Sequence, residues 1–184
     1  MNTTITRLFT LIVVTAATFT AKAQTYTSTK DVNIFGDTVV TYHDQTGAPA
    51  YTVTNGTDIF GNKTSKTTNS QGIQVQSITS TPTVGGVNQT VTGSNGLPAG
   101  SIQVSKDIFG NDQKAVSNAQ GQPVATVSTT TDLAGNVTKV ISENGTPVIT
   151  IHISKDAFGN DVKTINTQLD TETEDNLLRS CGEL

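Results

Sequence analysis

Apolar and polar residues alternate along several short segments of this chain, and a period of two predicts strands with one buried face. The alternation is clearest at 51–54, 125–128 and 149–154, where Tyr, Val, Ala or Ile residues oppose Thr, Ser or His. Segments such as 137–142 and 161–166 are more polar and alternate only weakly. The pattern therefore predicts β structure with an apolar face and a face of hydroxyl side chains.

A short phrase returns at regular intervals and divides the chain into repeats. Asn33-Ile34-Phe35-Gly36-Asp37 recurs at 58–62, 107–111, 132–136 and 156–160, with a degenerate copy at 83–87. The glycines of the phrase lie 24 or 25 residues apart, at Gly36, Gly61, Gly86, Gly110, Gly135 and Gly159. Self-similarity at a fixed period is typical of repeat architectures, so we expect six repeats.

A second turn lies inside each repeat, 10 or 11 residues after the first glycine. Its glycines are Gly47, Gly72, Gly96, Gly121 and Gly145. Asp-x-x-Gly is typical of a type I turn, and Asn-Gly supplies two residues that tolerate positive φ. Each repeat is therefore predicted to consist of turn, strand, turn and strand.

Two all-β architectures fit a two-strand repeat of this length. In a β-solenoid like residues stack in columns, and Phe35, Phe60, Phe109 and Phe158 share one such position. In an antiparallel meander each turn closes a hairpin, which is what Asn-Gly and Asp-x-x-Gly favour. We favour the solenoid slightly over the meander. We therefore expect an elongated molecule whose chain bends at the glycines.

The two ends of the chain depart from the repeat. Residues 1–23 have the charge, apolar run and Ala21-Lys22-Ala23 site of a signal peptide, which leaves 24–169 as the β-repeat domain. In the tail, 170–184, Thr171 and Glu174 have the spacing of a capping box and predict a short helix. We interpret this helix as a cap on the last repeat, with a docking or export signal as the alternative.

Composition and charge narrow the function. The chain has 34% hydrophobic residues and no Trp. Its formal net charge of −4 disfavours nucleic acid or an anionic membrane as the main partner. No segment after the signal peptide is apolar enough to span a membrane. Cys181 is the only cysteine, so an intramolecular disulfide is excluded, although a free thiol could bridge two chains.

With these repeats, the mature chain resembles curlin-type subunits of bacterial extracellular amyloid fibres in general plan. The resemblance covers residues 24 to about 167 and implies a secreted subunit that assembles with copies of itself. The phrase around Asp132-Leu133-Ala134-Gly135-Asn136 is also similar to the YD repeats of Rhs-type shell proteins. The regular internal Gln of curlin repeats and the Tyr of YD repeats are missing here, so neither resemblance transfers a functional residue.

No group of residues has the pattern of an active site. His43 and His152 occupy different repeats and different positions within them, and Cys181 lies in the tail. We therefore expect no catalysis and no cofactor. A stacked column of Asp107, Asp132 and Asp156 could hold calcium, but Asp at the first position of a type I turn is ordinary turn capping.

The remaining candidate is the surface. Hydroxyl pairs on the polar strand face could bind ice, glycan or mineral, with Thr27, Thr29, Thr52, Thr54, Thr126 and Ser128 as the candidate residues. The sequence favours a secreted, cell-surface-associated and non-enzymatic protein that self-associates into an extracellular fibre, matrix or adhesive layer. A monomeric protein that binds a surface through the hydroxyl face is the alternative.

Overall fold

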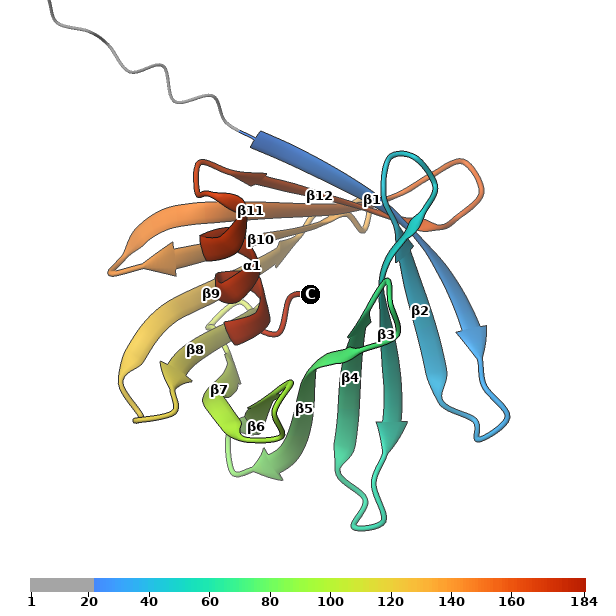
Figure 1. Ribbon diagram of the computed structural model, residues 1–184. Coiled ribbons are helices and arrows are strands. Elements are labelled where there is room, and N and C mark those ends of the chain that lie inside the picture. Colours follow the sequence, from blue (N-terminus) through green and yellow to red (C-terminus); the bar gives the residue numbers. More distant parts are fainter. Residues whose placement is uncertain (1–21) are drawn as a thin grey trace, which may run out of the picture.

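The computed structural model describes residues 22–184 (Figure 1). It consists of antiparallel strands and one C-terminal helix, which confirms the all-β fold, the two strands per repeat and the short helix. The signal-peptide prediction lies outside the described residues except at Lys22 and Ala23, which belong to the first strand. The elements are β1 (Lys22–Val32), β2 (Thr38–His43), β3 (Pro49–Thr57), β4 (Lys63–Asn69), β5 (Gln74–Thr83), β6 (Gly86–Gly93), β7 (Pro98–Lys106), β8 (Asp112–Asn118), β9 (Pro123–Thr131), β10 (Val137–Glu143), β11 (Thr146–Lys155), β12 (Asp161–Thr167) and α1 (Thr171–Ser180).

The strands form a closed barrel, so the predicted solenoid is wrong. Each strand pairs with its neighbours in the sequence, and β1 pairs with β12, from Lys22 opposite Thr167 to Thr27 opposite Val162. Every turn reverses the chain, as the hairpin chemistry indicated, but the meander closes instead of remaining open. The similar positions in successive repeats therefore lie around a barrel and not along the axis of an elongated molecule.

The alternation of side chains divides the barrel into a lumen and an outer surface. Ile151 on β11 lies opposite Ile165 on β12, and both are fully buried. Their neighbours Thr150 and Thr164 face outward, because successive side chains of a strand point to opposite sides. The predicted assignment of one apolar and one hydroxyl-rich face is therefore correct, and the apolar face is the inside of the barrel.

Beta-bulges occur at one end of the barrel, where β2, β4, β6, β8 and β10 lead into the next strand. The register shifts after Tyr42, Thr67, Val91, Val116 and Ile141. Each bulge accommodates one extra residue in the following strand, and at Val124 and Val148 that residue packs against the core. The bulges therefore bend the strands and add apolar contacts near this end.

Helix α1 lies inside the ring of strands, and the C-terminus ends near the centre of the barrel (Figure 1). Leu177, Leu178 and Cys181 pack with the apolar residues of β6 to β12, whereas the buried residues of β4 and β5 are the polar Thr67 and Gln76. The tail is thus a core element of a barrel that has no open stack of repeats to cap.

Two local predictions need correction. The N-cap of α1 is Asp170, whose carboxylate accepts hydrogen bonds from the N–H groups of Glu172 and Thr173; the expected capping box began one residue later. In the degenerate repeat the turn glycine is Gly85, with φ of 88°, and not Gly86. Gly86 already belongs to β6, where a Cβ atom would lie 2.1 Å from the carbonyl oxygen of Val104. The other glycines assigned to turns have positive φ.

Candidate functional site

Large apolar side chains are exposed on the hairpin tips at one end of the barrel. These tips connect β1 to β2, β3 to β4, and so on to β11 and β12, and in an up-and-down barrel such connections share one end. The exposed side chains, which we call the tip ring, are Ile34, Phe35, Ile59, Phe60, Val84, Ile108, Phe109, Leu133 and Phe158. Their exposed fractions run from 81% at Phe35 to 110% at Leu133. At the other end, Ile73 and Leu97 are the large exposed apolar residues of the described chain, at 57% and 62%.

Five of the six tips, all except the β5–β6 tip, are held by the acidic or amide residue that begins the turn. In the β3–β4 tip, Asp58 Oδ1 accepts from the N–H groups of Phe60 and Asn62, while Oδ2 accepts from the Asn62 side chain. The Gly61 N–H donates to the Asp58 carbonyl oxygen at 3.0 Å. The same bonds form at Asp107, Asp132 and Asp156. The turns therefore present their two central residues to solvent in one fixed geometry.

These hydrogen bonds also favour the ionised form of the turn carboxylates. Donation from the Asn62 side chain and the turn N–H groups holds the pKa of Asp58 below its usual range, and the equivalent bonds lower the pKa of Asp107, Asp132 and Asp156. None of the four forms an ion pair with another residue between 22 and 184. The apolar tips are therefore underlain by negative charge.

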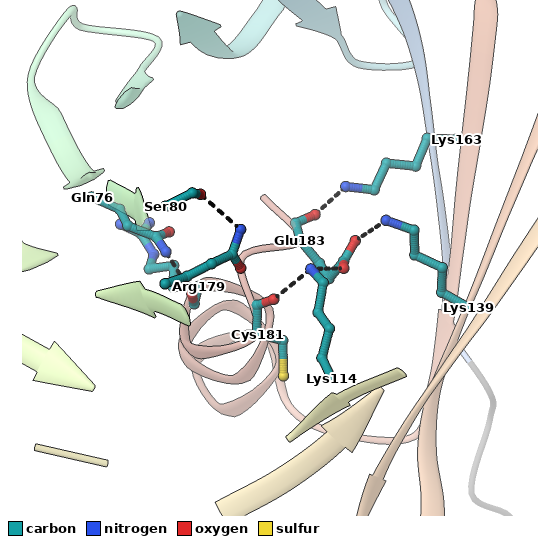
Figure 2. A network of polar contacts seen from close by, with 9 residues as sticks. Gln76, Ser80, Lys114, Lys139, Lys163, Arg179, Cys181 and Glu183 are labelled. Carbon is teal, nitrogen blue, oxygen red and sulfur yellow. Dashed lines mark hydrogen bonds and ion pairs between the residues drawn. The ribbon is translucent and has the colours of Figure 1, made fainter. Parts of the chain in front are cut away.

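A second unusual feature is a charge cluster in the lumen, shown in Figure 2. The Glu183 carboxylate accepts from Lys114 Nζ and Lys139 Nζ, each at 2.6 Å, and is 4% exposed. Lys163 Nζ donates to the Glu183 main-chain oxygen and to the Tyr51 hydroxyl, the latter at 3.2 Å. Three strands of the barrel thus hold the end of the tail through their lysines.

The cluster shifts the pKa values of its members in opposite directions. Burial lowers the pKa of Lys163 to about 8, and the nearby Glu183 only partly offsets this. Burial by itself raises the pKa of Glu183, but the ammonium groups of Lys114 and Lys139 more than compensate and hold it below its usual range. At neutral pH the cluster is therefore charged, with more cationic than anionic side chains.

Two cavities flank the tail inside the barrel. One of about 530 Å³ lies between α1 and strands β5 to β10, with Gln76, Glu143 and Arg179 among its lining residues. The other, of about 370 Å³, is lined by Tyr26, Leu178 and several acidic residues of α1. The main-chain oxygen of Arg179 already accepts from Gln76 at 2.6 Å. The cavities show that the helix fills the lumen only in part.

The candidate hydroxyl residues do not form one flat face. Thr27 and Thr29 on β1 lie near Thr52 and Thr54 on β3, with β2 between them. Thr126 and Ser128 are on β9, which is not adjacent to any of these strands. Because the barrel is closed, its outer surface is convex, and the hydroxyl groups point in different directions around it.

The residues considered for catalysis or redox chemistry are also dispersed. His43 is on β2, and His152 on β11 contacts the Thr138 hydroxyl through Nδ1 at 3.1 Å. Cys181 is fully buried, and burial raises the pKa of its thiol to about 12, so it is not placed to bridge two folded chains. Among residues 22–184 no three His, Cys, Asp or Glu side chains gather as a metal site.

Sequence reasoning missed both the tip ring and the lysine cluster. The signal for each was present in the repeat: Ile-Phe pairs recur before the turn glycine, and Lys114, Lys139 and Lys163 each follow it by four residues. What the sequence did not reveal was that the tips project into solvent and that the lysines point inward.

Helix α1, the one helix within residues 22–184, lacks the length and apolar character needed to cross a membrane. No protein-family model matches the chain, and no curated protein matches it.

Proposed function

We propose that this chain is a secreted, non-enzymatic attachment protein of an extracellular adhesive layer, and that it attaches through the tip ring. The observation that carries the proposal is the exposure of Ile59, Phe60, Ile108 and Phe109 and their equivalents at one end. Large apolar side chains gathered in solvent at one end of a molecule are typical of an interaction surface.

The construction of the tips supports this role. An exposed apolar side chain on a loop is usually free to fold back, but each Ile-Phe pair sits on a turn closed by several hydrogen bonds. A rigid presentation reduces the entropy lost on contact and so favours binding. Secretion is supported by the predicted signal peptide, and the absence of catalysis by the dispersed positions of His43, His152 and Cys181.

The fold restricts the route by which copies could associate. Assembly by strand pairing needs an unpaired strand at the end of the repeats, but β1 pairs with both β2 and β12. Within the described chain, the barrel has no free strand edge for such pairing. The protein therefore attaches through the side chains of its tips and not through the backbone of a strand edge.

Adsorption to an octyl-agarose matrix tests the proposal. The quadruple variant Ile59→Ser, Phe60→Ser, Ile108→Ser, Phe109→Ser is expected to elute well before the unmodified protein, because two tips lose their apolar area. A matched control, Ile73→Ser with Leu97→Ser, removes apolar residues from the other end and is expected to behave like the unmodified protein. Circular dichroism checks that all three are folded; equal retention of the three proteins would refute the proposal.

A further inference from the structure

We infer that the apolar surface contacted by the tip ring is the interface of a lipid bilayer with zwitterionic headgroups, into which the tips insert separately. This inference rests on the proposed function, because it names the surface to which the tip ring attaches. Three features of the tips favour it: their separation, their internally paired backbone and their negative charge.

The tips are separate from one another. Because Ile59, Ile108 and Leu133 are 93% exposed or more, the apolar side chains of neighbouring tips do not cover each other. A protein partner would need a matching depression for each tip around the ring. A fluid lipid surface accommodates isolated apolar wedges without such complementarity, and each side chain contributes through its own burial.

Most backbone N–H groups of the tips, although not that of Ile59, have partners within the turn. In the β3–β4 tip the N–H groups of Asp58, Phe60, Gly61 and Asn62 all have partners within the turn. An unpaired amide costs about 2–7 kcal/mol on transfer out of water, so partners inside the turn lower the cost of insertion. Strand β4 begins only at Lys63, so the partners of these N–H groups all lie in the turn itself.

The negative charge at the tip ring favours contact with some surfaces over others. Lys106 and Lys155 are paired with Asp112 and Asp161 of their own hairpins, at 2.7 and 2.6 Å, whereas the turn aspartates have no cationic partner in the described chain. A second copy docked ring to ring would bring aspartates of the same sign together, and an anionic membrane would repel them. A zwitterionic surface avoids both penalties.

A tryptophan placed in a tip reports insertion directly, because the chain has no Trp of its own. Phe109→Trp is the probe, and Leu97→Trp at the other end of the barrel is the matched control. With phosphatidylcholine vesicles, we expect the emission of the tip variant to move to shorter wavelength and the protein to float with the vesicles. The control variant should float too, through its intact tips, but with unchanged emission.

Two further measurements separate the alternatives. Replacing Ile59 and Phe60 with Ser in the tip-tryptophan protein should lower its vesicle partition coefficient by about tenfold or more, because the apolar area of one tip is lost. Vesicles of phosphatidylglycerol at low salt should bind the protein more weakly than phosphatidylcholine, and added salt should reduce the difference.

The outcomes distinguish this inference from the proposed function. Retention on octyl-agarose without any binding to phosphatidylcholine would overturn the lipid inference and leave a protein partner for the tip ring. A tip-specific emission shift that depends on protein concentration without vesicles would identify a second copy as the partner and also overturn it. Loss of both retention and flotation would overturn the proposed function together with the inference.

Discussion

Glu183 is a buried carboxylate whose two oxygens are each bound by a lysine from a different strand. Replacing it in the Glu183→Gln variant leaves the partly buried ammonium groups of Lys114 and Lys139 without a counter-charge. We expect a loss of about 3–5 kcal/mol in the free energy of unfolding, the usual cost of removing one partner of a buried ion pair. Urea denaturation followed by circular dichroism measures this loss.

A second ion pair, within α1, supplies the control for this variant. Asp175 and Arg179 are four residues apart, and both are partly exposed. Because such pairs contribute only about 0.3–0.5 kcal/mol, Asp175→Asn should leave the urea midpoint nearly unchanged. Similar losses in the two variants would show that Glu183 is not held in the lumen.

Lys163 gives the stability of the protein an unusual dependence on pH. Its pKa is about 8 in the folded protein, against 10.5 for an unperturbed lysine, so between these values the unfolded chain binds a proton that the folded chain does not. Stability should therefore rise as the pH increases from about 8 to 10, by up to about 3 kcal/mol. Above that range the trend should reverse, since burial raises the pKa of Tyr42 and Tyr51 and keeps them protonated only in the folded state.

Urea denaturation at a series of pH values measures this dependence. The variant Lys163→Met lacks the titrating group and should lose the rise between pH 8 and 10 while remaining folded, because a methionine fills similar volume without charge. If the unmodified protein were instead less stable at pH 9.5 than at pH 7.5, the assigned direction of the Lys163 shift would be incorrect.

At the scale of elements, α1 forms part of the core of the barrel. Leu178 is 3% exposed and packs with the isoleucines of the surrounding strands. Leu178→Ala should reduce the free energy of unfolding by about 2–5 kcal/mol, as for other buried leucines. Asn176→Ala, an exposed position on the same helix, should cost much less, and thermal denaturation of the two variants measures the difference. Equal effects would place the helix outside the lumen.

The elements themselves were largely predictable from the sequence, because period-two alternation and turn chemistry are local signals. The weak alternation of β10 and β12 has a specific cause: their inward positions include Lys139 and Lys163. These lysines satisfy their charge and hydrogen bonds with Glu183 in the tail, a contact between residues far apart in the sequence. Local pattern therefore classified the strands as polar, although their lysines are inside.

The closure of the barrel was not predictable in the same way. Aromatic residues at equivalent positions in the repeats, such as Phe60 and Phe109, favoured stacking, yet both are exposed on separate tips. Whether a series of hairpins closes depends on the twist and bending of every strand, and the bulges contribute to both. The bulges follow from no single residue type, since Val75 and Ala99 occupy equivalent positions in neighbouring hairpins.

At the scale of the whole molecule, closure predicts a disulfide between the first and last strands. Thr25 and Thr164 are paired across β1 and β12, with their hydroxyl oxygens 3.5 Å apart. The double variant Thr25→Cys, Thr164→Cys should form an intramolecular disulfide on oxidation and gain about 4–5 kcal/mol, because the bond closes a long loop. Gel mobility with and without reductant detects the bond, and thermal denaturation measures the gain.

A second pair of cysteines tests whether the disulfide depends on the adjacency of the two strands. Thr25→Cys with Ser128→Cys joins β1 to β9, which are not adjacent in the barrel. This variant should give no intramolecular bond under the same conditions. An open arrangement of the repeats would give none in either variant.

The pairing of β1 with β12 and the insertion of the tail also determine when the protein is able to fold. Residues 22–27 pair with residues 162–167, and Lys114 pairs with Glu183. Neither contact can form until nearly the whole chain has left the ribosome. Long-range β pairing is slow, typically taking milliseconds to seconds, and the lumen-facing isoleucines stay uncovered during that interval. During this delay the chain remains unfolded, and an unfolded chain is the form that export through a membrane channel requires. The proposed secretion of this protein would use that delay.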